Sequence, residues 1–399
     1  MIAEYLQKNY SSDISLALLS RVFHLNEHYI SRVFKEETGE NFLSYLNRIR
    51  IEEAKKLLLE SDKKIYEIAE ETGFQSSVNF NYVFKRFAGI SPKMFREQFG
   101  KKMRWTVMKL QHGIYYAYWE KEWSGDYLYY IEKAAELGFD ILEIAAGPLA
   151  EYTSGYMKKI KNKAKMCGIR ITAGHGPLKT QDISSGDKNI RAKALEFYKK
   201  LFNNMAEMDI NLIGGALYSY WPVDYSLPFS KEETWKRSVE GVGLMGETAK
   251  VYGITLCMEV LNRFENYLIN TACEGKKFVE EINMDNVKLM LDTFHMNIEE
   301  VSMGEAIRTS GQWLGHFHTG ECNRMVPGKG RMPWREIREA LEDIRYHGAA
   351  VMEPFVQMGG TVGKDIKIWR NMYNCVTEEM LDLDAREALT FQRYMLDYD

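Results

Sequence analysis

The sequence predicts an α/β fold: a (β/α)8 barrel preceded by a small all-α double helix-turn-helix domain. Residues 1–104 show only the helical spacing of apolar residues, whereas short apolar runs alternate with amphipathic helices from residue 110 onward. Several of the later helices end at a glycine that is followed directly by an apolar run, as in KMCGIRITAG and KVYGITLCMEV. This is the expected turn from a helix into a strand.

The bulk properties of the 399-residue chain limit its class. With 45% hydrophobic residues, the chain can form two or three domains with separate cores. The net charge of −4 is not typical of a chain that binds nucleic acid or membranes as a whole. No apolar run is long enough to span a bilayer, and the N-terminus lacks the apolar segment of a signal peptide. The five cysteines form no CxxC pair, so we expect a cytoplasmic protein with reduced thiols.

The first domain is expected to be helical throughout. Apolar residues recur at helical spacing over residues 14–23, 29–37, 42–60, 65–74 and 78–89. Two short helices, a turn and a third helix occur twice, ending in FKEETG and FKRFAG, so we interpret the domain as a duplicated helix-turn-helix. The charge balance changes from slightly basic to acidic near residues 101–108. We therefore predict domains at 1–104 and 109–399.

Residues 1–99 resemble the AraC-type DNA-binding domain. The match lies in SRVF…YISRVFKEETG, YLNRIRIEEAKKLL and IAEETGF…FKRFAGISPKMFRE. The resemblance implies that two recognition helices, at about 26–37 and 76–87, enter successive major-groove segments. The side chains implied to face bases are His28, Ser31, Arg32, Ser77, Val78, Asn81 and Tyr82. Tyr82 departs from the family, which often has a basic residue there. The alternative is a helical oligomerisation domain that does not bind DNA.

Eight apolar runs are the candidate strands of the second domain. They cover residues 113–118, 140–146, 169–175, 210–217, 254–260, 287–294, 314–320 and 349–355. Helical segments such as SGDYLYYIEKAAEL lie between them, which favours the barrel. The alternative is an open doubly wound sheet, but no GxGxxG motif follows the first strand.

Four chemically active residues lie at the C-terminal ends of consecutive predicted strands. They are Glu259, Asp292, His318 and Glu353, each about one strand–helix unit after the last. Barrel enzymes place their chemistry at this rim. Three carboxylates brought together there would repel one another unless a cation were present. Two glutamates, an aspartate and a histidine form a hard ligand set, so we predict a site for Mn²⁺, Co²⁺ or Mg²⁺.

Other residues near this rim have less certain roles. His316 lies one layer below His318 and is expected to pack in the core. His175 is either a ligand or a loop histidine. Tyr115 and Trp221 are also consistent with plain packing, whereas Arg324 is expected to bind an anion or a hydroxyl group.

Residues 110–397 resemble the ketose 3-epimerases, the D-tagatose and D-psicose (D-allulose) 3-epimerase family of xylose-isomerase-like TIM barrels. The matching runs include LIGGALYSYWPVDY, EVLNRFENYLINTA, GHFHTGECNR and VMEPFVQMGGTVG, and they favour the D-psicose branch. The resemblance implies that Glu259, Asp292, His318 and Glu353 hold the metal and that Glu259 and Glu353 form the acid/base pair. The implied sugar-binding residues are Tyr115, Gly174, Trp221, Glu265, His295 and Arg324. The family also implies a homodimer or homotetramer.

The implied activity is metal-dependent inversion of C3 in free ketohexoses. The substrates are D-fructose and D-psicose, with D-tagatose and D-sorbose as further candidates. The proton on C3 leaves next to a carbonyl and returns to the opposite face through an enediolate, so two proton-handling groups are required. One alternative is an aldose–ketose isomerase on the same barrel. The other is an AraC-type transcription regulator that uses the barrel as a sugar-sensing effector domain.

The order of the two domains is unusual for such a regulator. AraC-type regulators usually carry the sensing domain before the DNA-binding helices, whereas here the barrel follows them. Met108-Lys109, just before HGIYYAYW, resembles the start of a stand-alone enzyme. We therefore expect a joined or mis-started frame in which the helical domain is dispensable for catalysis.

Overall fold

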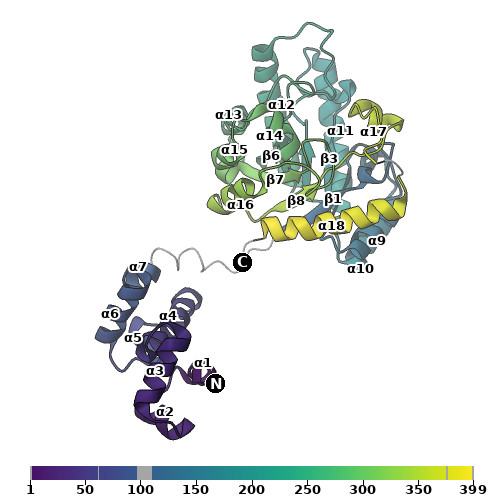
Figure 1. The fold of residues 1–399 in the computed structure, drawn as a ribbon. Helices are drawn as coiled ribbons and strands as arrows, with labels where there is room; N and C mark the ends of the chain where they lie inside the picture. Colours follow the sequence, from purple (N-terminus) through teal and green to yellow (C-terminus); the bar gives the residue numbers. More distant parts are fainter. Residues whose placement is uncertain (1, 62, 97–109, 374–375, 398–399) are drawn as a thin grey trace. The chain divides into compact units, whose positions relative to one another are not determined.

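The computed structural model describes residues 2–61, 63–96, 110–373 and 376–397. The chain divides into two compact units, Met1–Val107 and Met108–Asp399 (Figure 1). The predicted boundary at 101–108 and the proposed start at Met108-Lys109 lie in the part of the chain that is not described.

The first unit is all-helical. Its helices are α1 (Ile2–Asn9), α2 (Leu16–Phe23), α3 (Glu27–Thr38), α4 (Phe42–Glu60), α5 (Ile65–Glu71), α6 (Ser77–Ala88) and α7 (Pro92–Phe95). The five predicted helices are confirmed; α1 and α7 are additional. The side chains of Asn26 and Ser76 cap the N-termini of α3 and α6, and each helix ends at a glycine in the left-handed conformation. The two copies of the motif therefore end in the same way.

Helix α4 joins two separate hydrophobic clusters of the first unit. Phe42 and Leu46, near its start, belong to a cluster with residues of α1, α2 and α3. Ile51, Ala54 and Leu58, further along, belong to a cluster with residues of α5 and α6. Each helix-turn-helix copy thus has its own core, and a single 19-residue helix passes through both.

The second unit is a closed parallel barrel in which the eight strands follow sequence order. Strands β1–β8 are Gln111–Tyr115, Ile141–Ala145, Arg170–His175, Leu212–Gly215, Thr255–Glu259, Val287–Asp292, Leu314–Thr319 and Ala349–Met352. The predicted barrel is confirmed, and each of the eight candidate runs overlaps a strand. The first strand was predicted too far along the chain: β1 already begins at Gln111, and residues 116–118 form the 3-10 turn η2 (Tyr116–Tyr118).

Helices surround the barrel (Figure 1). The α-helices are α9 (Tyr127–Leu137), α10 (Ser154–Cys167), α11 (Lys188–Glu207), α12 (Lys231–Val251), α13 (Ala272–Ile282), α14 (Thr293–Glu299), α15 (Met303–Ser310), α16 (Trp334–Asp343), α17 (Gly360–Asp365) and α18 (Glu378–Leu396). Short 3-10 turns are η3 (Gly147–Glu151), η4 (Lys179–Gln181) and η5 (Gly311–Trp313). The run RYHGAAVMEP before β8, which also predicts a glycine turn, differs: Arg345, and not Gly348, has the positive φ there. Among the described helices, none is long and apolar enough to cross a membrane.

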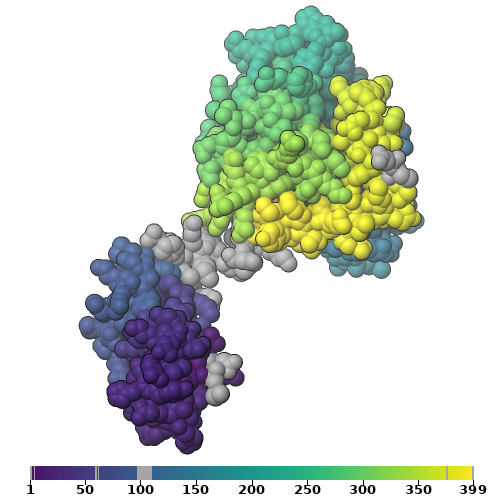
Figure 2. Space-filling model, in the orientation of Figure 1, coloured from purple at the N-terminus to yellow at the C-terminus, as the bar shows by residue number. Residues whose placement is uncertain are grey.

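Helix α18, yellow in Figures 1 and 2, packs beside β1 and α9. Its Gln392 donates a hydrogen bond to the backbone oxygen of Ala350, near the start of β8. The same amide lies 2.9 Å from Nδ1 of His112, near the start of β1. The helix therefore packs at the N-terminal ends of these strands, which leaves the C-terminal rim for a functional site.

Candidate active site and metal centre

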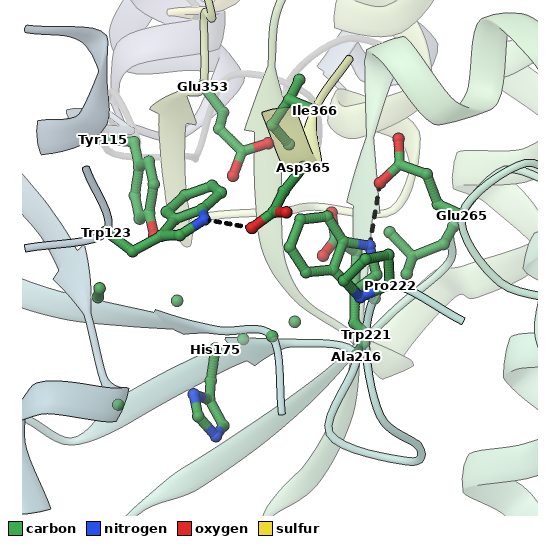
Figure 3. Close-up of a pocket in the computed structure, with 18 of the residues that line it drawn as sticks. Tyr115, Trp123, His175, Ala216, Trp221, Pro222, Glu265, Glu353, Asp365 and Ile366 are labelled. Atoms are coloured by element: carbon green, nitrogen blue, oxygen red, sulfur yellow. Dashed lines mark hydrogen bonds between the residues drawn. The ribbon is translucent and has the colours of Figure 1, made fainter. Parts of the chain in front are cut away.

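A cavity of about 570 Å³ lies at the C-terminal ends of the barrel strands (Figure 3). Its lining includes every sugar-binding residue implied by the sequence, namely Tyr115, Gly174, Trp221, Glu265, His295 and Arg324. Three of the four predicted metal ligands, Glu259, His318 and Glu353, line it too. The fold thus gathers residues from distant parts of the sequence around one space.

The four predicted metal ligands lie together. Each of Glu259, Asp292, His318 and Glu353 offers one ligand atom, and these atoms all lie within 4.8 Å of one another. Glu259 ends β5, Asp292 ends β6 beside His318 of β7, and Glu353 follows β8 directly. Three of the four are buried, and Glu353 is half-buried. Nδ1 of His318 is buried without a hydrogen-bond partner, as expected for a nitrogen that coordinates a cation. The donor set therefore fits one divalent cation.

The charges of this cluster are unbalanced without such a cation. Burial raises the pKa of Glu259 well above its ordinary value, and the nearby Glu353 carboxylate raises it further. Burial by itself lowers the pKa of His318, but the Glu143 and Glu353 carboxylates outweigh this effect and raise it well above its ordinary value. Both groups therefore tend to hold protons that a bound cation would displace.

Arg324 lies against the same cluster. Its Nη1 donates to Oδ2 of Asp292 at 3.3 Å and to Oε2 of Glu353 at 3.2 Å. Its Nη2 donates to Oε1 of Glu265 at 3.3 Å. The guanidinium carbon lies 3.7 Å from the ring centre of Phe294, so the flat group stacks on an aromatic face. Arg324 therefore presents fixed donors next to the ligand set.

His295 is held in one tautomer by a residue that the sequence did not reveal. The backbone N–H of Asn262 lies 3.2 Å from Nδ1 of His295, and the Asn262 side-chain amide nitrogen lies 2.7 Å away. Because a backbone N–H can only donate, Nδ1 must accept, and the ring proton must sit on Nε2. That Nε2 lies 3.6 Å from Oε1 of Glu259. Burial also lowers the pKa of His295, which favours this neutral donor.

Two tryptophans form the outer wall of the cavity (Figure 3). Trp221 donates from Nε1 to Oε2 of Glu265 at 3.1 Å, and Trp123 donates from Nε1 to Oδ2 of Asp365 at 2.8 Å. The two rings meet edge to face, with their centroids 6.0 Å apart. Trp123 and Asp365 were not predicted, because neither residue lies at a strand end. Each indole is thus fixed by a carboxylate.

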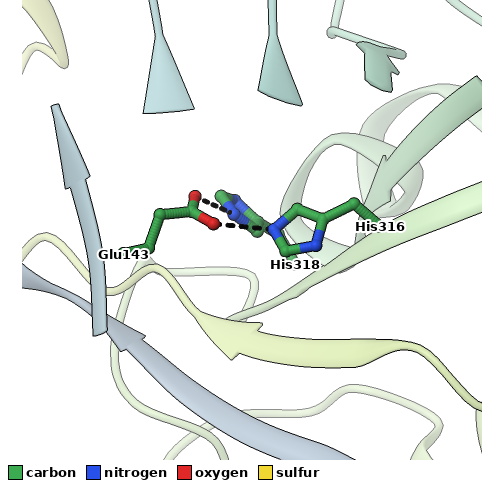
Figure 4. A group of neighbouring side chains, drawn as sticks. All are labelled: Glu143, His316 and His318. Atoms are coloured by element: carbon green, nitrogen blue, oxygen red, sulfur yellow. Dashed lines mark hydrogen bonds and ion pairs between the residues drawn. The ribbon is translucent and has the colours of Figure 1, made fainter. Parts of the chain in front are cut away.

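The structure also shows the surroundings of the two other histidines that the sequence placed near this rim. His316 is fully buried below His318, as expected, and both rings contact the buried carboxylate of Glu143 (Figure 4). Glu143 was not predicted; the only signal is its charge in the middle of the apolar run DILEIAA. The ring of His175 stacks against Phe197 of α11, 5.7 Å between centroids. His175 therefore packs against α11 and lines the cavity, but it lies outside the ligand set.

Comparisons with known proteins agree with this fold and site. The family described as xylose isomerase-like TIM barrel matches residues 131–372, and a helix-turn-helix domain family matches residues 19–98. The D-psicose 3-epimerase of Ruminiclostridium cellulolyticum is 58% identical over 288 residues, which cover 72% of this chain and 98% of that protein. The D-psicose 3-epimerase of Agrobacterium fabrum is 55% identical over 287 residues, covering 72% and 99%. The crystal structure of the Clostridium cellulolyticum H10 enzyme with D-tagatose superposes with a TM-score of 0.72, at 58% identity, and covers 72% of this chain and all of that one.

The fold and the site thus define an enzyme of the xylose isomerase-like TIM-barrel class, joined to an AraC-type helix-turn-helix domain. Within that class the chain belongs to the ketose 3-epimerase family.

Proposed function

We propose that the barrel unit inverts C3 of free ketohexoses and interconverts D-fructose and D-psicose, with D-tagatose and D-sorbose as further substrates. One divalent cation, Mn²⁺, Co²⁺ or Mg²⁺, would be held by Glu259, Asp292, His318 and Glu353. One observation carries the proposal: four ligand atoms lie within 4.8 Å of one another beside a cavity of about 570 Å³, which is large enough for a hexose. Two relatives at 55–58% identity that are D-psicose 3-epimerases support the choice of substrate.

Glu259 and Glu353 are the proposed acid/base pair. They come from β5 and from the residue after β8, three strands apart in the closed barrel, so each can face one side of C3. One takes the C3 proton, the other returns a proton to the opposite face, and the roles exchange with direction. The cation, when bound, supplies positive charge that makes the C3 proton more acidic.

Three further side chains would orient the sugar. His295 offers its Nε2–H beside Glu259, Arg324 offers guanidinium donors, and Glu265 accepts hydrogen bonds from bound hydroxyl groups. Tyr115 packs at the cavity wall, where a Cβ at Gly174 would lie 3.1 Å from its ring. Glycine at 174 therefore leaves room for the Tyr115 ring, which any side chain there would crowd.

Product analysis in D₂O tests this proposal. With D-fructose and Mn²⁺, we expect D-psicose that carries deuterium at C3, detected by chromatography and NMR. Hydrogen transfer between C1 and C2 would instead identify an aldose–ketose isomerase. Complete absence of turnover with Mn²⁺ or Co²⁺ would favour the sugar-sensing regulator.

Cation binding is expected to depend on pH. Because burial raises the folded-state pKa of Glu259, its proton stabilises the metal-free fold at low pH, and this contribution is lost as pH rises through that pKa. The cation needs the ionised Glu259 and the neutral His318, whose pKa is also raised. We expect Mn²⁺ to raise the Tm more at about pH 8 than at about pH 5.5, with proton release on binding. Thermal unfolding and calorimetry in several buffers measure both; a pH-independent gain in Tm would contradict the expectation.

We further propose that residues 1–99 bind DNA through α3 and α6. The side chains of His28, Arg32, Ser77 and Asn81 are exposed on these helices, and Ser31 is half-buried. Val78 and Tyr82 are 80% and 68% exposed, and they lie four residues apart on α6, so both are accessible to a partner on one face of that helix. The match to a helix-turn-helix family over residues 19–98 supports this function.

Loss of one basic side chain should weaken this binding. On a duplex selected by the full chain from a random pool, Arg32→Ala should cost about 1–3 kcal/mol, roughly tenfold or more, if Arg32 contacts a base. Arg48→Ala is the matched control, because Arg48 lies on α4 and pairs with Glu40. Fluorescence anisotropy at fixed salt measures both variants. Failure to select any duplex would favour the oligomerisation domain instead.

A further inference from the structure

We infer that Glu143 is the positioning residue that presents Nδ1 of His318 to the cation; this rests on the proposed metal site. Glu143 lies in β2, inside the barrel, and is fully buried. Its Oε1 lies 2.7 Å from Nε2 of His318, and its Oε2 lies 2.7 Å from Nε2 of His316 (Figure 4). The hydroxyl of Thr172, on the neighbouring strand β3, donates to Oε2 at 2.7 Å. One carboxylate thus receives three short hydrogen bonds.

The protonation of these groups follows from donor and acceptor chemistry. Two imidazole nitrogens and the Thr172 hydroxyl all lie within hydrogen-bond distance of this one carboxylate, which is the arrangement of an ionised acceptor surrounded by donors. An ionised carboxylate only accepts hydrogen bonds, so both imidazoles must donate from Nε2. A cation binds only the neutral ring, which has one N–H; that N–H sits on Nε2, and the lone pair of His318 is therefore confined to Nδ1.

The free nitrogen of His318 faces the ligand cluster. Nδ1 lies 3.6 Å from Oε1 of Glu353 and is buried without a hydrogen-bond partner. A lone pair and a carboxylate oxygen repel one another unless a proton or a cation lies between them. Glu143 therefore selects the tautomer, holds the ring angle and adds negative charge behind the ligand, as carboxylates behind metal-bound histidines generally do.

His316 distinguishes this role from simple core packing. It shares the carboxylate with His318 but lies one layer deeper and belongs to no ligand group other than the one with Glu143 and His318 among the described residues. If Glu143 served mainly as the hydrogen-bond partner of His316 in the core, replacing Glu143 and replacing His316 would change the Mn²⁺ affinity equally. If it serves His318, only loss of Glu143 should disturb the cation.

The test measures Mn²⁺ affinity by electron paramagnetic resonance, and kcat at saturating Mn²⁺, on the full chain. We expect Glu143→Gln to weaken Mn²⁺ binding by about 10- to 100-fold, with kcat at saturating Mn²⁺ within about threefold of the unmodified protein. Thr172→Val and His316→Gln are matched controls that remove other partners of Glu143, and each should change the Mn²⁺ Kd by less than about threefold. An unchanged Kd in Glu143→Gln, an equal loss in His316→Gln, or a kcat deficit that persists at saturating Mn²⁺ would each overturn the inference.

A second measurement needs no variant. In the Co²⁺-loaded protein, the Nε2–H of His318 should give a strongly shifted proton resonance that exchanges slowly with water, because Glu143 accepts it in a buried site. A resonance that disappears through rapid exchange would contradict this arrangement even if Glu143→Gln fails to fold. If the unmodified protein binds neither Mn²⁺ nor Co²⁺, the proposed function itself fails, which is a different outcome.

Discussion

Glu353→Gln and Glu259→Gln are each expected to lower kcat for D-fructose by about 10⁴-fold, the upper end of what one general acid or base contributes. Glutamine keeps an oxygen that can reach a cation, but it cannot accept or return a proton at C3. The effect should be large because, in the proposed mechanism, each glutamate serves one face of the carbon, and the ligand group found among the described residues holds no second carboxylate from the same strand end. Initial rates of D-psicose formation at saturating Mn²⁺ measure the loss.

Isotope exchange shows whether the two glutamates divide the faces between them. In D₂O, each variant should still exchange the C3 hydrogen of one epimer, and the two variants should act on opposite epimers. Asp224→Asn is the control, because Asp224 lies in the loop after β4 and pairs with Lys179, outside the cavity lining and the ligand set. Its kcat should stay within about twofold of the unmodified protein, as expected for a surface ion pair. Exchange of both epimers by both variants would exclude a two-base mechanism.

Removal of divalent cations is expected to abolish turnover, and Mn²⁺ or Co²⁺ should restore it. Without a cation, Glu259, Asp292 and Glu353 face one another, with Arg324 as a neighbouring positive charge. Burial and the Glu353 carboxylate then keep the pKa of Glu259 well above its ordinary value, and no divalent cation neutralises the charge that develops on the sugar. Activity after chelation and metal replacement, followed by chromatography, is the measurement.

The fold should survive this treatment. The hydrophobic core of the barrel is built by the strands and surrounding helices and does not depend on the ligand cluster. Far-ultraviolet circular dichroism should therefore remain unchanged, while the Tm falls. At a cation concentration 100 times Kd, binding alone accounts for about 2.7 kcal/mol of stability. Full activity of the chelated protein would contradict the proposed cation, whatever its Tm.

The part of the site that lies at strand ends could be predicted from the sequence. Glu259, Asp292 and His318 follow apolar runs at regular spacing, and parallel strands of a barrel bring their C-terminal ends to one rim. Glu353 lies one residue past β8, yet it remains at the same rim. Periodicity and topology were sufficient because each of these positions is fixed by the backbone.

The supporting residues could not be predicted in this way. The role of Glu143 could not be predicted because its partners, His316 and His318, lie on a strand far away in the sequence. Asn262 and Asp365 act from segments after strands, where the chain path depends on packing and not on a repeat. The end of β1 was predicted too late for a related reason: apolar residues of the run GIYYAY are buried both in the strand and in the turn η2.

The shared helix of the first unit has a consequence for how its two halves could evolve. Helix α4 is about 28 Å long at 1.5 Å per residue and carries the core residues of both halves. One residue inserted between Leu46 and Ile51 would rotate one half by about 100° relative to the other. Under the proposed DNA binding, a change in the spacing between the two contacted DNA segments would therefore require several coordinated changes. That spacing should change more slowly in evolution than the bases contacted by each half.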